Sequence, residues 1–154
     1  MEDDIMSDRV RRAEGRERGL LEALQLRASL VLTDYRDALL RNPDAIDLPV
    51  DQIDAGHVYV FERDDMVIGF VVVLPRADGQ ADLDGLFVEP DHWRSGVGRR
   101  LVQAAQAVAA NRGASQLYVV ASPQAQAFYE AYGFRACGVE QTRFGVAVGM
   151  KLLL

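Results

Sequence analysis

Cysteine is nearly absent from this chain of 154 residues, in which Cys137 stands alone. A single cysteine cannot form an intramolecular disulfide, and the two histidines do not combine with it into the spacing of a zinc site. A chain of this length buries enough surface to fold without such a staple. We therefore expect no metal, a reducing compartment, and a Cys137 that packs in the interior rather than acting as a nucleophile.

Long apolar runs and a surplus of basic residues are missing too. The N-terminal stretch MEDDIMSD is acidic and lacks the apolar segment of a secretion signal, and apolar runs such as residues 71–74 are far too short to span a bilayer. The net charge of −6 disfavours general nucleic-acid binding and mildly favours a cationic substrate. We expect a cytoplasmic protein with neither nucleic acid nor membrane as a partner.

Hydrophobic periodicity predicts one domain over residues 9–154, preceded by a flexible segment over residues 1–8. The expected strands cover residues 9–13, 57–62, 66–74, 82–90, 117–121, 135–139 and 146–152. The expected helices are residues 20–32, residues 34–41 with Thr33 as the cap, a helix after Gly98 that stops near Asn111, and a helix from Ser122-Pro123 to Gly133. Residues 43–56 are expected to form a loop or a short helical turn.

The order of these elements predicts the α/β (α+β) fold class. The strand at residues 82–90, the helix after it and the strand at residues 117–121 form a βαβ unit, whose two strands should be parallel. The hairpins on either side should be antiparallel. We expect a mixed, mostly antiparallel sheet of six to seven strands, with a central parallel βαβ unit and helices on both faces.

The segment between that strand and its helix, PDHWRSGVGRRLV, places Gly96 and Gly98 at a helix N-terminus. Free N–H groups and the positive end of the helix dipole meet there, and glycines let backbone amides close around an anion such as a pyrophosphate. Arg94, Arg99 and Arg100 add positive charge. The segment is neither a P-loop, because no Gly-Lys-Ser/Thr follows, nor a dinucleotide fingerprint, because Leu101 holds the third glycine position. Taken alone, the two glycines would equally suit a tight turn.

Two motifs together resemble the GCN5-related N-acetyltransferase (GNAT) superfamily. The acetyl-CoA loop of that family, Gln/Arg-x-x-Gly-x-Gly/Ala, aligns with WRSGVG, where Trp93 replaces Gln or Arg. The family's Asn-x-x-Ala-x-x-Phe-Tyr-Glu-x-x-Gly-Phe aligns with SPQAQAFYEAYGF, where only the leading Asn differs, replaced by Ser122. The resemblance extends from about Arg9 to the C-terminus and is sharpest over residues 82–134. It implies the acyl-CoA N-acyltransferase fold.

The resemblance also implies that acetyl-CoA is the co-substrate and that its acetyl group passes directly to an amine in a ternary complex. In such folds the pantetheine arm lies between two splayed parallel strands, where a strand N–H also polarises the thioester carbonyl. Gly85 suits a bulge that opens this splay. The residues implied to bind the cofactor are Leu86, Phe87, Val88, Arg94, Ser95, Gly96, Val97, Gly98, Arg99, Ser122 and Phe128.

Three residues are candidates for the proton transfers. Asp82 occupies a strand position where several family members carry a glutamate base, and Asp84 has the same facing by strand alternation, whereas Glu89 should face the opposite way. Alternatively, these acids are solvated or balance the arginines. Tyr129 matches the family's tyrosine near the CoA sulfur and would act as the acid, unless it is a core tyrosine beside Phe128.

The expected function is acetyl transfer from acetyl-CoA to a primary amine of a small molecule or a protein. The alternative is a non-catalytic acyl-CoA sensor or regulatory module on the same fold. A modifier of charged tRNA is a third class, which the acidic composition disfavours. We expect the acceptor to lie among residues 20–41, residues 42–56 and the last hairpin, and a homodimer is possible.

Overall fold

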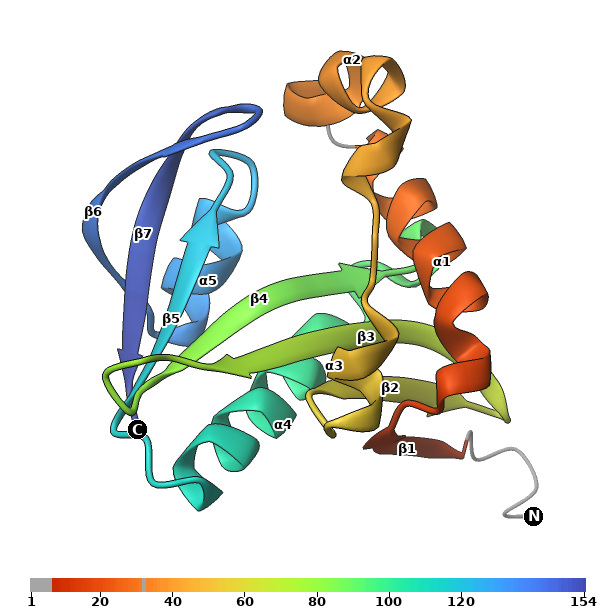
Figure 1. The fold of residues 1–154 in the computed structure, drawn as a ribbon, viewed down its shortest axis with the longest axis horizontal. Helices are drawn as coiled ribbons and strands as arrows, with labels where there is room; N and C mark the ends of the chain where they lie inside the picture. Colours follow the sequence, from red (N-terminus) through yellow and green to blue (C-terminus); the bar gives the residue numbers. More distant parts are fainter. Residues whose placement is uncertain (1–6, 32) are drawn as a thin grey trace.

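The computed structural model describes residues 7–31 and 33–154, with the side chains of residues 33–35 left out. Figure 1 shows the elements in chain order. They are β1 (Asp8–Arg12), η2 (Gly15–Glu17), α1 (Arg18–Val31), α2 (Thr33–Arg41), η3 (Pro43–Ala45), α3 (Val50–Asp54), β2 (Val58–Arg63), β3 (Met66–Pro75), β4 (Ala81–Val88), η4 (Pro90–His92), α4 (Val97–Asn111), β5 (Gln116–Ala121), α5 (Gln126–Tyr132), β6 (Arg135–Thr142) and β7 (Gly145–Leu153).

All strands belong to one seven-stranded sheet in the order β1-β2-β3-β4-β5-β7-β6. Neighbouring strands are antiparallel except β4 and β5, which are parallel and joined through α4. This arrangement confirms the expected mixed sheet with a central βαβ unit. Strand β3 lies between β2 and β4, and its residues 68–73 are all buried, as the continuous apolar run MVIGFVVVL predicts.

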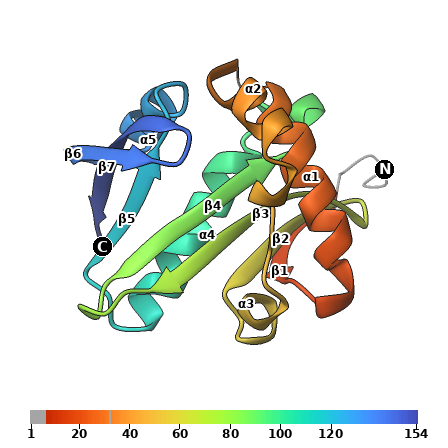
Figure 2. The ribbon, with the colours of Figure 1, turned by 45° about the horizontal axis from the view of Figure 1, so that its top comes forward.

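Each face of the sheet has its own apolar core, and Figure 2 shows α1 and α4 on opposite sides of the strands. On one face α4 and α5 pack through residues such as Leu101, Ala105 and Tyr129. On the other face Leu21 and Leu24 of α1 and Ile53 of α3 cover β2 and β3. Helices therefore cover both faces of the sheet. The candidate site lies near its centre, where β4 and β5 meet.

Several boundaries differ from the sequence-based expectations. Residues 43–56, expected to form a loop or a short helical turn, contain two short helical segments, η3 and α3, and β1 begins at Asp8. Residues 1–6 of the expected flexible segment lie outside the described residues, as does the side chain of Thr33, the expected cap of α2. Helix α5 starts at Gln126, although Ser122 still caps the preceding turn, because its Oγ accepts a hydrogen bond from the Ala125 N–H at 3.2 Å.

The prediction that Cys137 packs in the interior is wrong. Cys137 is exposed on the edge strand β6. It occupies a β-bulge, because Ala136 pairs with Met150 and Gly138 with Gly149, so Cys137 has no partner on β7. Among the described residues, no helix has the length and apolar character that crossing a membrane requires.

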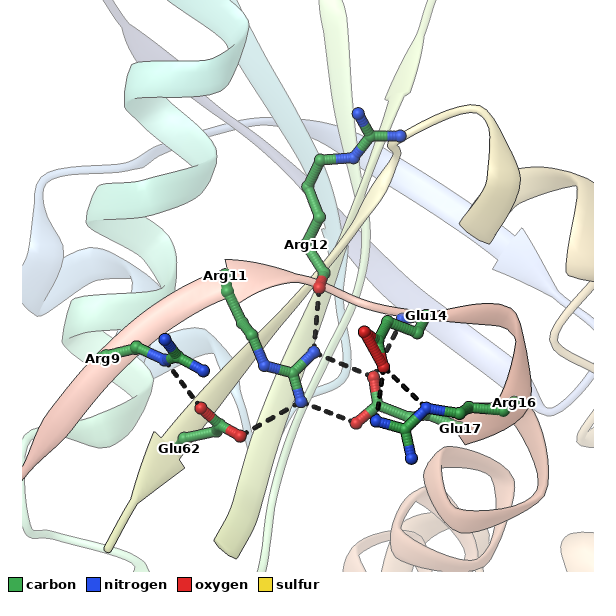
Figure 3. A network of polar contacts seen from close by, with 7 residues as sticks. All are labelled: Arg9, Arg11, Arg12, Glu14, Arg16, Glu17 and Glu62. Atoms are coloured by element: carbon green, nitrogen blue, oxygen red, sulfur yellow. Dashed lines mark hydrogen bonds and ion pairs between the residues drawn. The ribbon is translucent and has the colours of Figure 1, made fainter. Parts of the chain in front are cut away.

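A polar network fastens the first strand and the first helical turn to β2 (Figure 3). Arg11 lies at its centre and donates to Glu17 Oε2 at 2.7 Å and to Glu62 Oε2 at 3.1 Å. Glu17 and Glu62 are both buried, and Arg9 supplies a further bond to Glu62 at 2.8 Å. Because the hydrogen bonds from Arg11 stabilise the charged carboxylates, the pKa values of Glu17 and Glu62 lie below the ordinary glutamate value.

Candidate active site

The site begins where the parallel strands β4 and β5 part. They pair over only three positions, Ala81 with Leu117, Asp82 with Tyr118 and Leu83 with Val119, and then diverge (Figure 2). Asp84 is the first β4 residue beyond this pairing. It is also the extra residue of a β-bulge, since Val73 pairs with Leu83 and Val72 with Gly85. The sequence-based expectation of a bulge at Gly85 thus places it one residue too late.

After Leu83, the edge of β4 that faces β5 has no partner strand. The Glu89 N–H donates to the Ile68 carbonyl of β3 at 2.8 Å, so by strand alternation Phe87 also directs its backbone groups to β3. The free edge therefore offers the N–H and C=O groups of Leu86 and the N–H of Val88, whereas the Phe87 backbone, which was expected to contribute, faces β3. Trp93, the residue that departs from the family loop, donates its indole N–H to the Val88 carbonyl at 2.7 Å.

The bulge at Asp84 reverses the facing of every later side chain on β4. Leu83, Leu86 and Val88 face the core under α4, whereas Phe87 packs into the core under α1. Glu89 lies on the α1 side as well, where both its oxygens accept bonds from Arg27 at 2.9 and 2.5 Å. The predicted opposite facing of Glu89 is therefore wrong, because the prediction assumed unbroken alternation across the bulge.

The loop between β4 and α4 has an unusual backbone. Arg94 has φ 63° and Gly96 has φ 87°, both in the left-handed region. Gly96 is the N-cap of α4, and a Cβ built there would have no atom within 4 Å. Gly96 is required for its conformation rather than for close packing, and the space in front of it is open.

This backbone leaves six consecutive N–H groups, those of residues 94–99, without an acceptor among the residues that the structure describes. The first helical bond comes only from Arg100, whose N–H donates to the Gly96 carbonyl at 3.1 Å. The guanidinium groups of Arg94 and Arg99 are exposed and have no carboxylate partner within the described part of the chain. Free amides, a helix N-terminus and unpaired positive charge together form a site suited to an anion.

Helix α5 closes this loop from the side. A Cβ at Gly98 would lie 3.3 Å from Phe128 Cζ, so a side chain there would push the Phe128 ring slightly away. Arg99 stacks over the Tyr132 ring at 5.2 Å, and the Tyr132 hydroxyl donates to Gln106 at 2.7 Å. Phe128 therefore borders the free amides, as the family motif implies.

The two candidate bases differ in their surroundings. Asp82 Oδ1 accepts a hydrogen bond from Arg76 Nη1 at 2.8 Å, so its carboxylate is engaged in an ion pair. Asp84 is exposed and has no ion-pair partner among the described residues. Neighbouring protein atoms nevertheless desolvate its carboxyl and raise its pKa, and the negative charge of Asp82 raises it further. Of the two, Asp84 is the carboxylate that is free to accept a proton.

Tyr129 lies in the core between α4 and α5 and is 6% exposed. Its ring makes edge contacts with Phe128 at 5.1 Å and with Phe134 at 5.3 Å. Burial raises the pKa of its phenol, and no hydrogen-bond partner for the hydroxyl lies in the described part of the chain. The hydroxyl thus remains able to bond a ligand.

Comparison with known proteins decides the identity of this arrangement. The model of the acetyltransferase (GNAT) domain matches residues 54–136, more than half of the chain. The chain belongs to the GNAT family. This matched region contains β4, the loop with its free amides, α4, β5 and α5.

Individual relatives and solved structures resemble the chain over most of its length. The UPF0039 protein C11D3.02c of Schizosaccharomyces pombe is 27% identical over 110 residues, covering 68% of this chain and 73% of the relative. PaiA N-acetyltransferase of Thermoplasma acidophilum, solved in complex with coenzyme A, has a TM-score of 0.78 at 17% identity and covers 96% of this chain and 99% of its own. A GCN5-related N-acetyltransferase of Rhodopseudomonas palustris has a TM-score of 0.77 at 19% identity, with 97% and 98% covered. At these identities the two structures show the shared GNAT fold.

Some contacts of this GNAT domain could not be found from sequence. Arg76 and Gln80, in the turn before β4, contact Asp82 and the start of β5. Arg143, at the tip of the β6–β7 hairpin, lies 3.3 Å from Asp44 next to α2 and so bridges the two sides of the molecule. His57 Nδ1 lies 3.0 Å from Arg112 Nη1, at the end of α4 opposite to the GNAT loop. No group of three or more metal-binding side chains occurs among the described residues.

Proposed function

We propose that the protein transfers the acetyl group of acetyl-CoA to a primary amine by direct attack in a ternary complex. The observation that carries this proposal is the row of six unpaired N–H groups at residues 94–99, next to the unpaired edge of β4, in a GNAT domain. The structure of PaiA N-acetyltransferase, which contains coenzyme A, supports the same donor. The acceptor amine is a small molecule or a protein amine.

The diphosphate of acetyl-CoA would bind the amides of residues 94–99, which include Ser95 and Val97. Gly96 leaves room for the phosphates, and the positive charges of Arg94 and Arg99 attract the negative charges of the diphosphate. The pantetheine arm would then follow the free edge of β4 as an added strand would, bonding the N–H and C=O groups of Leu86 and the N–H of Val88. An N–H on this edge would also bond the thioester oxygen as negative charge develops on it.

Chemistry requires a neutral amine, because an ammonium group has no lone pair. An unperturbed alkylammonium has a pKa of about 10.4, so a base must remove its proton. Asp84 serves as this base, directly or through water, because its carboxylate is free and its raised pKa makes it a stronger base than an ordinary aspartate. Asp82, the first candidate from sequence, is occupied by Arg76.

The amine nitrogen then forms a bond to the thioester carbon, and the C–S bond breaks with its electrons going to sulfur. Tyr129 would donate a hydrogen bond to the departing thiolate. Because burial raises the pKa of Tyr129, full proton transfer to a thiolate, whose thiol has a pKa of about 8.5, is uphill. A hydrogen bond from the phenol still stabilises the charge, and the thiolate can take its final proton from solvent.

A panel of primary amines, with free CoA measured as released thiol, tests the proposal. We expect at least one amine to release CoA above background and to gain a mass of one acetyl group. Asp84→Asn should lower kcat strongly and leave the Kd for CoA unchanged. If CoA binds with the same affinity, but no amine in a broad panel is acetylated, the protein is a non-catalytic acyl-CoA-binding module instead.

A further inference from the structure

The turn between β3 and β4 contacts the start of β5, at the end where β4 and β5 are still paired. Gln80 Oε1 accepts three hydrogen bonds from the segment that enters β5: from the Ser115 N–H at 2.7 Å, the Gln116 N–H at 2.9 Å and the Ser115 hydroxyl at 3.2 Å. No other described side-chain oxygen of this turn reaches β5. Gln80 thus holds the start of β5 beside the start of β4, just before the two strands separate.

Arg76, four residues earlier, contacts both strands at one level. Its Nη1 donates to Asp82 of β4 at 2.8 Å, and its guanidinium carbon lies 4.2 Å from the centre of the Tyr118 ring of β5. Asp82 and Tyr118 are direct partners in the β4–β5 pairing. Arg76 also lies 3.4 Å from Asp78, at the limit of a hydrogen bond. The guanidinium therefore bonds to β4 and stacks on β5, one residue before the last pair of these strands, Leu83 with Val119.

The next free carboxylate above this contact is Asp84. In a bulge of this kind the extra residue faces the same way as its neighbour, and Gly85 pairs with Val72, whose side chain packs under α1. Asp82 and Asp84 therefore lie on the same face of β4. Arg76 bonds to Asp82, the one that lies within the paired part of β4 and β5.

Other charged groups near this face do not compete for Asp84. Arg27 and Glu89, at the open end, bond to each other, and Lys151 on β7 lies opposite Tyr118. After burial, the negative charge of Asp82 is the second cause that raises the pKa of the Asp84 carboxyl. Whatever changes the charge of Asp82 therefore changes the environment of Asp84.

We propose that Arg76 and Asp82 form a positioning pair for the reaction: Arg76 neutralises Asp82, and the pair holds Asp84 as the free carboxylate that receives the proton of the amine. This inference rests on the proposed acetyl transfer, because it assigns a role within that reaction. Neither residue of the pair needs to touch the substrate.

The pH dependence of kcat/KM tests the pair, since Asp84 works in its charged form and activity falls as pH drops through its pKa. Asp82→Asn removes a negative neighbour, so the acid limb of the profile should move to lower pH. Arg76→Gln leaves Asp82 charged and unpaired, so the limb should move to higher pH. For carboxylates separated by one residue, the Coulomb interaction near a surface corresponds to about a two- to fivefold change in relative activity on the limb, in opposite directions for the two variants.

Matched variants separate this role from a structural one. Arg76→Lys keeps the charge next to Asp82 and should keep the wild-type limb, and the double variant R76Q/D82N, which removes both charges of the pair, should give a limb between those of the two single variants. Asp78→Asn removes another carboxylate beside the same arginine, away from β4, and should leave the limb unchanged. Loss of stability alone would lower activity at every pH without moving the limb.

NMR titration of the Asp84 side-chain carboxyl in the same variants gives a readout that needs no acceptor. Opposite displacements of its midpoint in Asp82→Asn and Arg76→Gln are expected, and unmoved or equal midpoints would overturn the pair. If Asp84→Asn keeps both activity and the acid limb, whereas Asp82→Asn abolishes turnover, Asp82 is the base and the pair is likewise wrong. A wild-type protein that acetylates no amine would contradict the proposed function, and the titration would still decide the coupling.

Discussion

Replacing Gly96 with glutamate tests the anion site, and Gly113 supplies a matched control. Both glycines have φ 87°, and a Cβ on either would meet no atom within 4 Å. They lie at opposite ends of α4, Gly96 before its first turn and Gly113 after its last. The same substitution therefore brings the same backbone strain and the same charge to two places, of which only one is the proposed phosphate site.

The expected magnitudes follow from this geometry. A side chain in the left-handed region costs about 1–2 kcal/mol, so both variants should lose that much stability, or roughly 2–8 °C in Tm for a chain of this size. A carboxylate about 5 Å from a phosphate, at an effective dielectric constant of about 20–40, adds roughly 1.5–3 kcal/mol of repulsion. Gly96→Glu should therefore weaken CoA binding at least about tenfold, and Gly113→Glu should not weaken it.

Isothermal titration calorimetry with CoA measures the affinity, and thermal unfolding of the free proteins measures the stability. If Gly96→Glu bound CoA as tightly as the wild type, the diphosphate could not lie on these amides. Equal weakening in Gly96→Glu and Gly113→Glu would mean that loss of stability, rather than charge at the loop, caused the effect.

Two further substitutions test the acid role and the structural network. Tyr129→Phe should lower kcat and leave the Kd for CoA nearly unchanged, and a variant with wild-type turnover would remove the tyrosine from the mechanism. Arg11→Gln should lower the free energy of unfolding in urea by about 2–3 kcal/mol, because it leaves Glu17 and Glu62 buried without their shared partner. The pKa values of both glutamates are lowered in the folded state, so their contribution is complete above the ordinary glutamate pKa and disappears as pH falls through the folded values. Stability of the wild type should therefore decline in this acidic range, and equally steep decline in Arg11→Gln would contradict the assignment to Arg11.

Much of the fold could be predicted because apolar spacing determines strand and helix so directly. The run at residues 66–74 has no polar alternation, which fits only a central strand, and β3 is such a strand. Helix α3 could be predicted only as a loop or a short helical turn, because its five residues, VDQID, span little more than one turn and offer no periodicity to detect. Cys137 was misplaced because it lies on the edge strand β6, of which nearly every residue is exposed.

The candidate site, too, could be predicted from the sequence only in part. The glycines of the loop could be predicted to matter because a left-handed backbone at a helix N-terminus favours glycine. Gly96 has such a backbone, and the space in front of it is open. The bulge was also foreseen, but the facing of Glu89 was worked out without its extra residue. Arg76 and Gln80 carried no signal, because contacts from a turn to a strand 35 or more residues away leave no pattern in sequence.

The most direct test of the account is the response of the amides of residues 94–99 to CoA in a two-dimensional ¹H–¹⁵N NMR titration. The account predicts that these amide protons shift downfield and become protected from exchange with water as the diphosphate accepts their hydrogen bonds. Unchanged signals at these positions, with the largest shifts elsewhere on the molecule, would contradict it.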